Sequence, residues 1–497
     1  MSNVRVTYSG LIAFVVGIAS TITGFVFTII VTRRLSPEDL GLWTLIGSLV
    51  SYVVIIEPII SYWTSRQIAR GEKVGKTAVL TSGAFSAAAT IAYFVMAIYI
   101  TYVLKTDATS IFLASVLVPL TFLGNTLTGI SLSHKPHAVS YGMIVFEIAK
   151  LPLGFGFVFI GQMGLFGAIL ATIFASLAKI IILLIMVRQE LYDKINLQTI
   201  RYWLKLFWIP LYASFTGLIF SLDVLIYSLL TNSLIGLAYW GVANTISNIV
   251  IHSGQMSQAL YPKLLAQGRK EFAEENLKRL MYFAIPILAL SIVLAKPALF
   301  VLNPKYVQGF YIVYFLSIRS IINILTNVFY NILAAYETID LEKQASFRQY
   351  VKSKLFVIPT LSYVMNGSYV ILLAVFLITI KGTTMSEVSM VIVWSIILLA
   401  TSIPFMIYSL VLVKRQYKIN FPIKIVLKYA GATLVSSVAI YFVSSSVLSY
   451  AMTVYEFVPR VILSAGIGGG IYLGITYAID KSTRELLGSI AKELKIK

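Results

Sequence analysis

The 497-residue chain contains no cysteine and only three histidines. Without cysteine it forms no disulfide, thiolate metal site, thiol nucleophile or covalent haem attachment. Three dispersed histidines are too few for a histidine metal cage. Charged residues are also scarce, at 12% of the chain, against about 25% in soluble domains. The sequence therefore predicts no metal site and no cofactor, and the shortage of charge argues against a water-soluble protein.

Apolar residues and basic charge dominate what remains. Hydrophobic residues make up 58% of the chain, and 39 lysines and arginines outnumber 20 aspartates and glutamates, for a net charge of +19. In a soluble protein such a charge indicates a nucleic-acid partner. In so apolar a chain, basic residues instead mark the cytoplasmic ends of transmembrane helices. The composition predicts a polytopic membrane protein with no nucleic-acid partner.

Long apolar runs predict fourteen transmembrane helices in an all-α fold, because a helix needs about 20 mainly apolar residues to cross the hydrocarbon core. A capping motif opens the second run: Ser36 is spaced as an N-cap, Pro37 takes the first helical position, and two acids follow. The expected spans are 9–31, 40–62, 77–104, 109–132, 139–160, 164–187, 202–230, 234–260, 277–301, 309–336, 356–380, 387–413, 423–448 and 458–479.

The distribution of lysine and arginine predicts the orientation. If the N-terminus is cytoplasmic, the inner connections hold 29 of the 39 basic residues and the outer connections hold 7. Positive residues accumulate on the cytoplasmic side, so both termini are expected there, in a multi-pass protein of the cell (plasma) membrane. No connection approaches the roughly 50 residues of the smallest domains. Function is therefore expected to lie between the helices.

Polar residues at membrane depth are the candidate functional residues. A charge at a helix centre costs roughly 2.5 to 3.5 kcal/mol on insertion scales unless it faces water or a partner. Two expected spans carry polar residues every four positions, which places them on one helix face. The stripes predict a hydrophilic passage, with interhelical hydrogen bonds as the alternative. Their members are Asn244 and Asn248 in the eighth span, and Arg319, Asn323, Asn327 and Asn331 in the tenth.

Acidic residues inside the apolar runs are few. Glu57 precedes Pro58 in the second span, and Asp223 lies in the seventh. Either acid is a candidate for ion coupling, because burial and exposure change how tightly a carboxyl holds a proton. A fixed salt bridge is the alternative for both. Glu147 and Lys150 are three residues apart in the fifth span, a spacing at which they neutralise each other.

Arg33 and Arg34 depart from the charge pattern, since they lie at the outer end of the first span. Paired guanidinium groups suit bidentate phosphate binding, and anchoring to lipid headgroups is the alternative. ATP hydrolysis needs a glycine-rich loop that ends in Lys-Ser or Lys-Thr, and the chain has none. The glycine-rich runs 154–156 and 466–470 lie inside apolar spans, where small residues allow close helix packing.

A short internal repeat links the two halves of the sequence. Leu40-Gly41-Leu42 opens the second span, and Ile235-Gly236-Leu237 opens the eighth, 195 residues later. Such a repeat is typical of transporters built from two similar bundles around a central site. It predicts that spans one to six and seven to twelve are parallel repeats, related by an axis along the membrane normal.

The stretch Arg34-Leu35-Ser36-Pro37-Glu38-Asp39-Leu40-Gly41-Leu42 is followed by Glu57, Arg66 and the run Ile68-Ala69-Arg70-Gly71. With these residues the sequence resembles the polysaccharide-transport flippases of the multidrug/oligosaccharidyl-lipid/polysaccharide (MOP) superfamily. Members typically show an acid, a glycine two residues later and an arginine nine after the acid. Glu57 and Arg66 fit this pattern, whereas Ile59 replaces the glycine. The motif likeness covers about the first 75 residues, and the span number and connection lengths match over the whole chain.

The resemblance implies two pseudo-symmetric six-helix bundles around a central cavity, with two extra C-terminal helices that offer a groove for a lipid tail. The expected divisions are an N-terminal bundle at 1–200, a C-terminal bundle at 201–415, the extra helices at 416–480 and a cytoplasmic amphipathic tail at 481–497.

The leading hypothesis is a flippase that moves an oligosaccharide linked to a polyprenyl phosphate or diphosphate from the cytoplasmic to the outer leaflet by alternating access. Arg33, Arg34 and Arg319 would contact phosphate, and the asparagines of both stripes would contact sugar hydroxyls. Glu57 or Asp223 would couple transport to H⁺ or Na⁺. Membrane lipids are the other expected partners, and the chain is expected to be a monomer without enzymatic activity. The alternatives are an ion-coupled multidrug antiporter of the same superfamily and a membrane-embedded glycosyltransferase or ligase.

Overall fold

The computed structural model describes residues 20, 22–135, 137–257, 264, 270–337, 347–481, 483–485 and 488, and every regular element among them is a helix. The chain forms two compact units. Unit 1 comprises Met1–Gly241 and Ser362–Glu387, and unit 2 comprises Val242–Leu361 and Val388–Lys497. Helices α11 (Ile235–Ile251) and α17 (Lys354–Thr379) contribute residues to both. These units do not test the expected divisions at 200, 415 and 480, which stay predictions.

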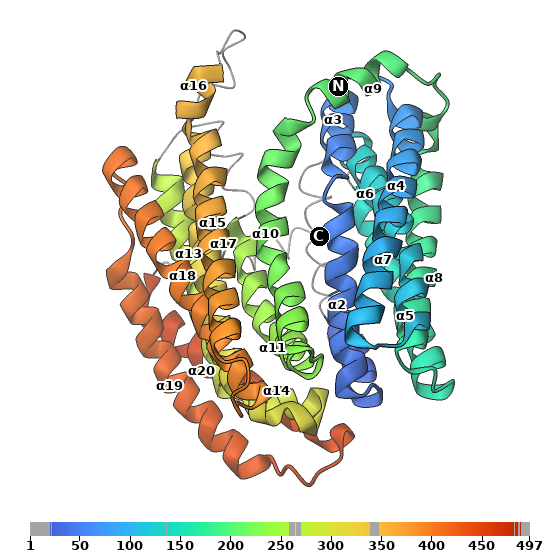
Figure 1. Cartoon of the computed structure of the whole chain (residues 1–497). Coiled ribbons are helices and arrows are strands. Elements are labelled where there is room, and N and C mark those ends of the chain that lie inside the picture. Colours follow the sequence, from blue (N-terminus) through green and yellow to red (C-terminus); the bar gives the residue numbers. More distant parts are fainter. Residues whose placement is uncertain are drawn as a thin grey trace. The chain divides into compact units, whose positions relative to one another are not determined.

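Unit 1 has helical residues at 20 and 22–34, the first helical segment, and the capping motif that the sequence predicted follows it. The Asp39 N–H donates to Ser36 Oγ at 3.0 Å, and Pro37 is the first residue of the helix. That helix ends at Val54, and the next begins at Pro58 with a bend of 59° between them, because proline offers no N–H for a continuing helix. The helices of unit 1 are α2 (Pro37–Val54), α3 (Pro58–Ala69), α4 (Gly75–Leu104), α5 (Ala108–Leu113), η1 (Ala114–Val116), α6 (Leu117–His134), α7 (His137–Gly154), η2 (Phe155–Ile160), α8 (Gly164–Val187), η3 (Arg188–Leu191), α9 (Leu197–Lys205) and α10 (Trp208–Thr231) (Figure 1).

The core of unit 2 lies between helices α13 (Lys270–Val293) and α15 (Phe310–Ala335). Leu277 and Leu280 of α13 belong to the same buried apolar cluster as Val328 and Leu333 of α15. The helices of unit 2 are η4 (His252–Ser257), α13 (Lys270–Val293), α14 (Ala295–Leu302), η5 (Pro304–Gly309), α15 (Phe310–Ala335), α16 (Phe347–Lys352), α18 (Glu387–Tyr417), α19 (Ile423–Val447) and α20 (Val454–Ile479), the first residue of α18 lying in unit 1.

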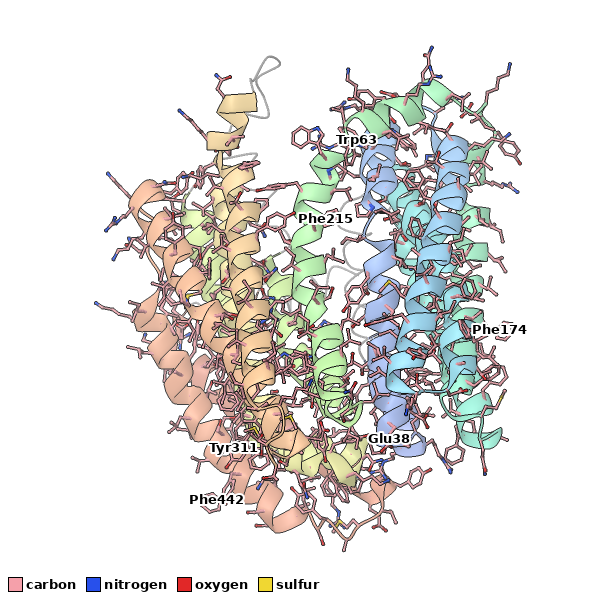
Figure 2. All side chains as sticks on the ribbon, in the orientation of Figure 1. Glu38, Trp63, Phe174, Phe215, Tyr311 and Phe442 are labelled. Carbon is pink, nitrogen blue, oxygen red and sulfur yellow. The ribbon has the colours of Figure 1, made fainter. Side chains whose placement is uncertain are left out.

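The surface of both units is apolar. Large hydrophobic side chains are exposed, among them Phe174 on α8 and Phe442 on α19 (Figure 2). Within the described residues, eleven helices are long and apolar enough to cross a membrane, or twelve if the bent pair α2 and α3 is one span. The chain is therefore a multi-pass membrane protein. The count of fourteen stays a prediction, because the first expected span lies partly outside the described residues and α11 has 17 residues. The orientation and the identity of the membrane are predictions too.

The second expected span, at 40–62, is divided between α2 and α3, and two further expected spans differ from the structure. The seventh was placed at 202–230, but α9 ends at Lys205 and a separate helix, α10, starts at Trp208. The reason is local, since 197–205 alternates polar and apolar residues with helical periodicity and makes an amphipathic helix. The ninth, at 277–301, divides at Leu294 into α13 and α14, where Pro297 interrupts the hydrogen-bond ladder.

Both glycines of the sequence repeat lie at close contacts within unit 1, Gly41 against the turn that precedes α11 and Gly236 against α10. A Cβ atom added to Gly41 would overlap the backbone carbonyl of Leu234, and one added to Gly236 would overlap the ring and hydroxyl of Tyr227. Helices approach this closely only where the side chain is a hydrogen atom. The repeat thus marks two packing sites, whereas the predicted relation between the two halves stays a prediction.

Candidate functional site

Glu57 occupies the break between α2 and α3 in unit 1. Its side chain is 3% exposed. The Ser61 hydroxyl donates to Glu57 Oε2 at 3.0 Å, and the Thr126 hydroxyl of α6 donates to Oε1 at 3.2 Å. No lysine, arginine or histidine of the described residues forms a salt bridge with this carboxyl. Arg66, the arginine of the family pattern, lies over the Tyr62 ring, with its guanidinium carbon 4.8 Å from the ring centre. The structure therefore contains a buried carboxyl held by neutral groups.

Asp223 is a second buried carboxyl of unit 1, at 2% exposure on α10. The Tyr369 hydroxyl of α17 donates to Asp223 Oδ2 at 2.7 Å, and the Val224 N–H donates to Oδ1 at 2.7 Å. Two residues before Asp223, the Ser221 carbonyl accepts a hydrogen bond from the Tyr52 hydroxyl of α2. Hydrogen bonds at this level therefore hold α2, α10 and α17 together, and the Asp223 carboxyl is part of that network.

Glu147 and Lys150 form the ion pair that their spacing predicted. Their Oε2 and Nζ atoms are 3.4 Å apart on α7. The hydroxyls of Ser20 and Thr23 donate to the Glu147 carboxyl at 2.9 and 2.8 Å, so the pair also attaches the first helical segment to α7. The Lys150 ammonium lies 4.9 Å from the centre of the Phe27 ring. These groups neutralise one another inside unit 1.

The arginines near the end of the first helical segment differ in their surroundings. Arg33 is half-buried and Arg34 is exposed. The Arg34 guanidinium lies 4.0 Å above the Phe159 ring, which stacks on Phe155 with centroids 4.9 Å apart. Both phenylalanines belong to η2, a short π-helix at the end of α7. Sequence reasoning missed this aromatic pair, although π-helical turns are frequent at functional sites.

Gly154 explains why the aromatic pair sits at this point. A Cβ atom there would come within 2.6 Å of the Phe27 ring, so only glycine lets α7 approach the first helical segment this closely. The glycines of 154–156 were expected to serve helix packing, and Gly154 does so. The contact holds the start of η2 beside the segment that carries Arg34.

In unit 2 the predicted stripe of α15 changes in exposure along its length. Arg319 and Asn323 are half-buried, whereas Asn327 and Asn331 are exposed. The rest of this helix is largely buried, with Val328 2% exposed. In a membrane protein an exposed amide must face water or a polar ligand, because hydrocarbon leaves its hydrogen bonds unmade.

The second predicted stripe lies on α11. Asn244 is half-buried and Asn248 is exposed, both within unit 2. The Asn244 carbonyl accepts a hydrogen bond from the Ser247 hydroxyl at 3.1 Å. Neither asparagine is deeply buried, so this helix too presents amides at its surface. The structure assigns no ligand to any of these residues, and their functional roles stay predictions.

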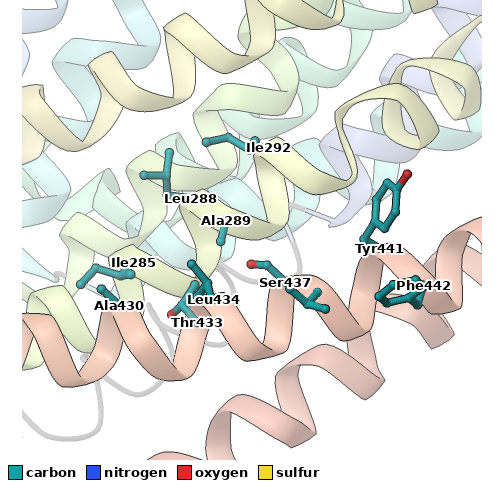
Figure 3. Close-up of a pocket in the computed structure, with 11 residues that line it drawn as sticks. Ile285, Leu288, Ala289, Ile292, Ala430, Thr433, Leu434, Ser437, Tyr441 and Phe442 are labelled. Atoms are coloured by element: carbon teal, nitrogen blue, oxygen red, sulfur yellow. The ribbon is translucent and has the colours of Figure 1, made fainter.

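An apolar groove of about 550 Å³ also lies in unit 2, between α13 and α19 (Figure 3). Ile285, Leu288 and Ile292 line one side, and Leu434 and Phe442 line the other. The resemblance implied a lipid-tail groove made by the thirteenth and fourteenth spans. This groove is made by the ninth and thirteenth.

These helices define a membrane protein with the fold of known transporters. No protein-family model and no curated protein matches the sequence. A solved structure of the lipid II flippase MurJ, in an inward closed conformation, aligns with a TM-score of 0.64 at 14% identity, over 96% of this chain and 100% of that chain. An inward-facing MATE-family transporter of the MOP superfamily aligns with a TM-score of 0.57 at 13% identity, over 80% and 96%. A MATE structure in the straight conformation gives a TM-score of 0.53 at 16% identity, over 84% and 96%. The likeness to the MOP superfamily is thus confirmed at the level of the fold.

Proposed function

We propose that this protein is a flippase that moves a polyprenyl phosphate- or diphosphate-linked oligosaccharide from the cytoplasmic to the outer leaflet by alternating access. The observation that carries the proposal is the alignment with the lipid II flippase, which extends over 96% of this chain and all of that chain. The two MATE structures cover 80% and 84% of this chain. The larger shared portion favours a lipid-linked substrate over a small drug.

The polar stripes give this substrate a path. Its sugar and phosphate groups are excluded by hydrocarbon, and its polyprenyl chain is excluded by water. The exposed amides of Asn327, Asn331 and Asn248 supply both donors and acceptors for sugar hydroxyls. Half-buried Asn244 and Asn323 extend the same two faces. We therefore assign the sugar to the asparagine-bearing faces of α11 and α15.

Phosphate binding is assigned to the arginines. Arg319 is the cation of the α15 stripe, and Arg33 and Arg34 are adjacent near the end of the first helical segment. A guanidinium that stacks on an aromatic ring keeps its N–H donors in its own plane, parallel to the ring face, where they can form a bidentate contact. The Arg34 guanidinium carbon lies 4.0 Å from the centre of the Phe159 ring, close enough for such a contact. The apolar groove between α13 and α19 suits the polyprenyl chain.

Ion coupling is assigned to Glu57 in preference to Asp223. Burying an ionised carboxylate without a cation is costly, and a bound H⁺ or Na⁺ would remove that cost. Glu57 has hydroxyl donors around it and lies at a helix break, the kind of site at which discontinuous transporter helices bind coupling ions. Asp223 belongs to a network that joins three helices.

An ion-coupled multidrug antiporter is the second candidate. The MATE structures share the fold, and Glu57 and Asp223, two of the buried carboxyls of unit 1, are the type of residue such an antiporter requires. A membrane glycosyltransferase or ligase is the third and has no structural neighbour in its favour among those described.

Reconstitution separates the three functions. Purified protein in vesicles should move a fluorescent polyprenyl diphosphate-linked oligosaccharide between leaflets, measured by quenching with a membrane-impermeant reductant. Drug efflux driven by a proton or sodium gradient, without glycolipid movement, would favour the antiporter. New glycosidic bonds formed in detergent, where no second compartment exists, would favour the enzyme. Protein that translocates no polyprenyl-linked glycan contradicts the proposal.

A further inference from the structure

Helix α9 is a short amphipathic helix between two membrane-crossing helices of unit 1. It follows α8 and precedes α10, so it lies at the membrane surface. It runs across the ends of α3 and α4 (Figure 1). The Trp203 indole, 1% exposed, donates to Gln67 Oε1 at 2.8 Å, and the Asn196 N–H donates to Thr77 Oγ1 at 3.0 Å. These bonds fix which face of α9 points outward.

The outward surface of α9 is apolar. Leu197 is 67% exposed and Leu204 is 45% exposed, and Ile200 is half-buried between them. The spacing of three and four residues places these side chains on one helical face. The Tyr202 ring, also exposed, meets Trp63 edge to face at 5.5 Å, and Figure 2 labels Trp63 at the end of the unit opposite Glu38. Such a face is suited to the boundary between headgroups and acyl chains.

A basic edge borders this apolar face. Arg201 and Lys205, one turn apart, are exposed, and Lys194 precedes the helix. None of the three forms a salt bridge with a carboxylate of the described residues. The acids nearest in sequence have other partners.

The two acids that precede α9 in the sequence pair with residues outside this helix. Asp193 lies 3.9 Å from the Lys73 ammonium, and Glu190 lies 3.0 Å from His134 Nδ1. Within the described part of the chain, the cations of α9 therefore have no carboxylate partner, at a surface that also exposes leucine. Apolar contact beside unneutralised positive charge complements an anionic lipid, whose acyl chains and phosphate meet at the same depth.

We propose that α9 is a binding surface for anionic phospholipid, in which Arg201 and Lys205 contact the headgroup phosphate while Leu197 and Leu204 rest on the acyl chains. Lys194 adds to the positive field. Because α9 leads directly into α10, an anionic lipid bound there fixes the end of the helix that carries Asp223. The assignment does not depend on which substrate the protein moves.

Native mass spectrometry of the full chain tests this proposal. The protein is equilibrated in micelles with equal amounts of phosphatidylglycerol and phosphatidylcholine, and the retained lipids are compared. We expect the parental chain to retain phosphatidylglycerol preferentially, and R201Q/K205Q to lower that preference by about fivefold for each cation removed. The conservative variant R201K/K205R should keep it.

K105Q/K381Q is the matched control, because it removes two exposed cations of unit 1 outside α9. It should bind phosphatidylglycerol as the parent does, and all variants should melt at the parental temperature. Equal retention of both lipids by the parent, or equal losses in control and test variants, overturns the proposal. Displacement of phosphatidylglycerol by inorganic phosphate at the lipid's concentration would also overturn it, because it would identify a site for free anions.

Discussion

Polar side chains at membrane depth have different surroundings in the two units. In unit 1 the carboxyls of Glu57, Asp223 and Glu147 are buried and accept hydrogen bonds from hydroxyl groups. In unit 2, Asn327 and Asn331 extend from the exposed side of a helix that is otherwise largely buried. One sequence signal, a polar residue in an apolar run, therefore marks two situations. Internal networks join helices, whereas exposed amides need a partner from outside the protein.

The largest expected effect concerns the cation of the α15 stripe. We predict that Arg319→Leu lowers the rate of glycolipid translocation about a hundredfold, because a hydrogen bond to a charged group contributes about 1.5 to 3 kcal/mol. The rate is measured in vesicles of defined protein content. Expression and melting temperature should stay at the parental values.

Lys296→Leu is the control for Arg319→Leu, because it removes another cation of unit 2, one that is exposed and lies over the Phe310 ring. It should change the translocation rate less than twofold. If Arg319→Leu transports at the parental rate, the stripe of unit 2 is structural like the networks of unit 1, and the distinction between the units disappears.

A packing variant tests whether unit 1 is a close-packed scaffold. Gly41→Ala should reduce stability by about 2 kcal/mol, since overpacking costs about 1 to 3 kcal/mol and the obstructing atoms are the backbone carbonyl of Leu234. Thermal melting in detergent measures the loss. Gly47→Ala on the same helix has no atom within 4 Å of the new methyl group and should be neutral or slightly stabilising. Equal melting temperatures for the two variants would show that the backbone at Leu234 moves away from the new methyl group without loss of stability.

Local signals were read correctly from the sequence. The cap at Ser36 and the pair Glu147 and Lys150 depend on residues within four positions of one another, and the structure confirms both. The break at Pro58 was missed, because the second span was expected to run without interruption over 40–62. Helix boundaries and neighbouring charges follow from backbone geometry over one turn. Apolar run length likewise predicted the membrane helices.

Contacts between distant segments were not predictable. Thr126 donates to Glu57 from 69 positions away, and Tyr369 donates to Asp223 from 146 positions away. Which helices pair, and in what register, depends on packing that one sequence does not specify locally. For the same reason the stripe of α15 could be recognised from its spacing, while the difference in exposure between its two ends could not.

The coupling assignment predicts a smaller effect within unit 1. Glu57→Gln keeps a hydrogen-bonding side chain but removes the charge, so we expect translocation to fall about tenfold, about 1.4 kcal/mol, and to become independent of the applied proton or sodium gradient. Initial rates with and without each gradient give the result. Asp223→Asn should retain its dependence on the gradient. If Asp223→Asn loses the dependence on the gradient and Glu57→Gln keeps it, the coupling residue is Asp223. If both variants keep the dependence, neither acid couples transport to the ion.

The smallest expected effect comes from a matched pair of asparagines. Asn366 is 7% exposed in unit 1 and donates to the Thr216 carbonyl at 2.7 Å, whereas Asn327 is exposed in unit 2. One hydrogen bond contributes about 1 kcal/mol. We therefore expect Asn327→Ala to slow translocation about fivefold at unchanged stability, and Asn366→Ala to cost about 1 kcal/mol of stability. Translocation rates and melting temperatures are measured on both variants. The rate should fall for Asn327→Ala, and the melting temperature should fall for Asn366→Ala. If Asn327→Ala lowers the melting temperature instead, its amide bonds to protein, and the exposed face of α15 is not the surface that meets the sugar.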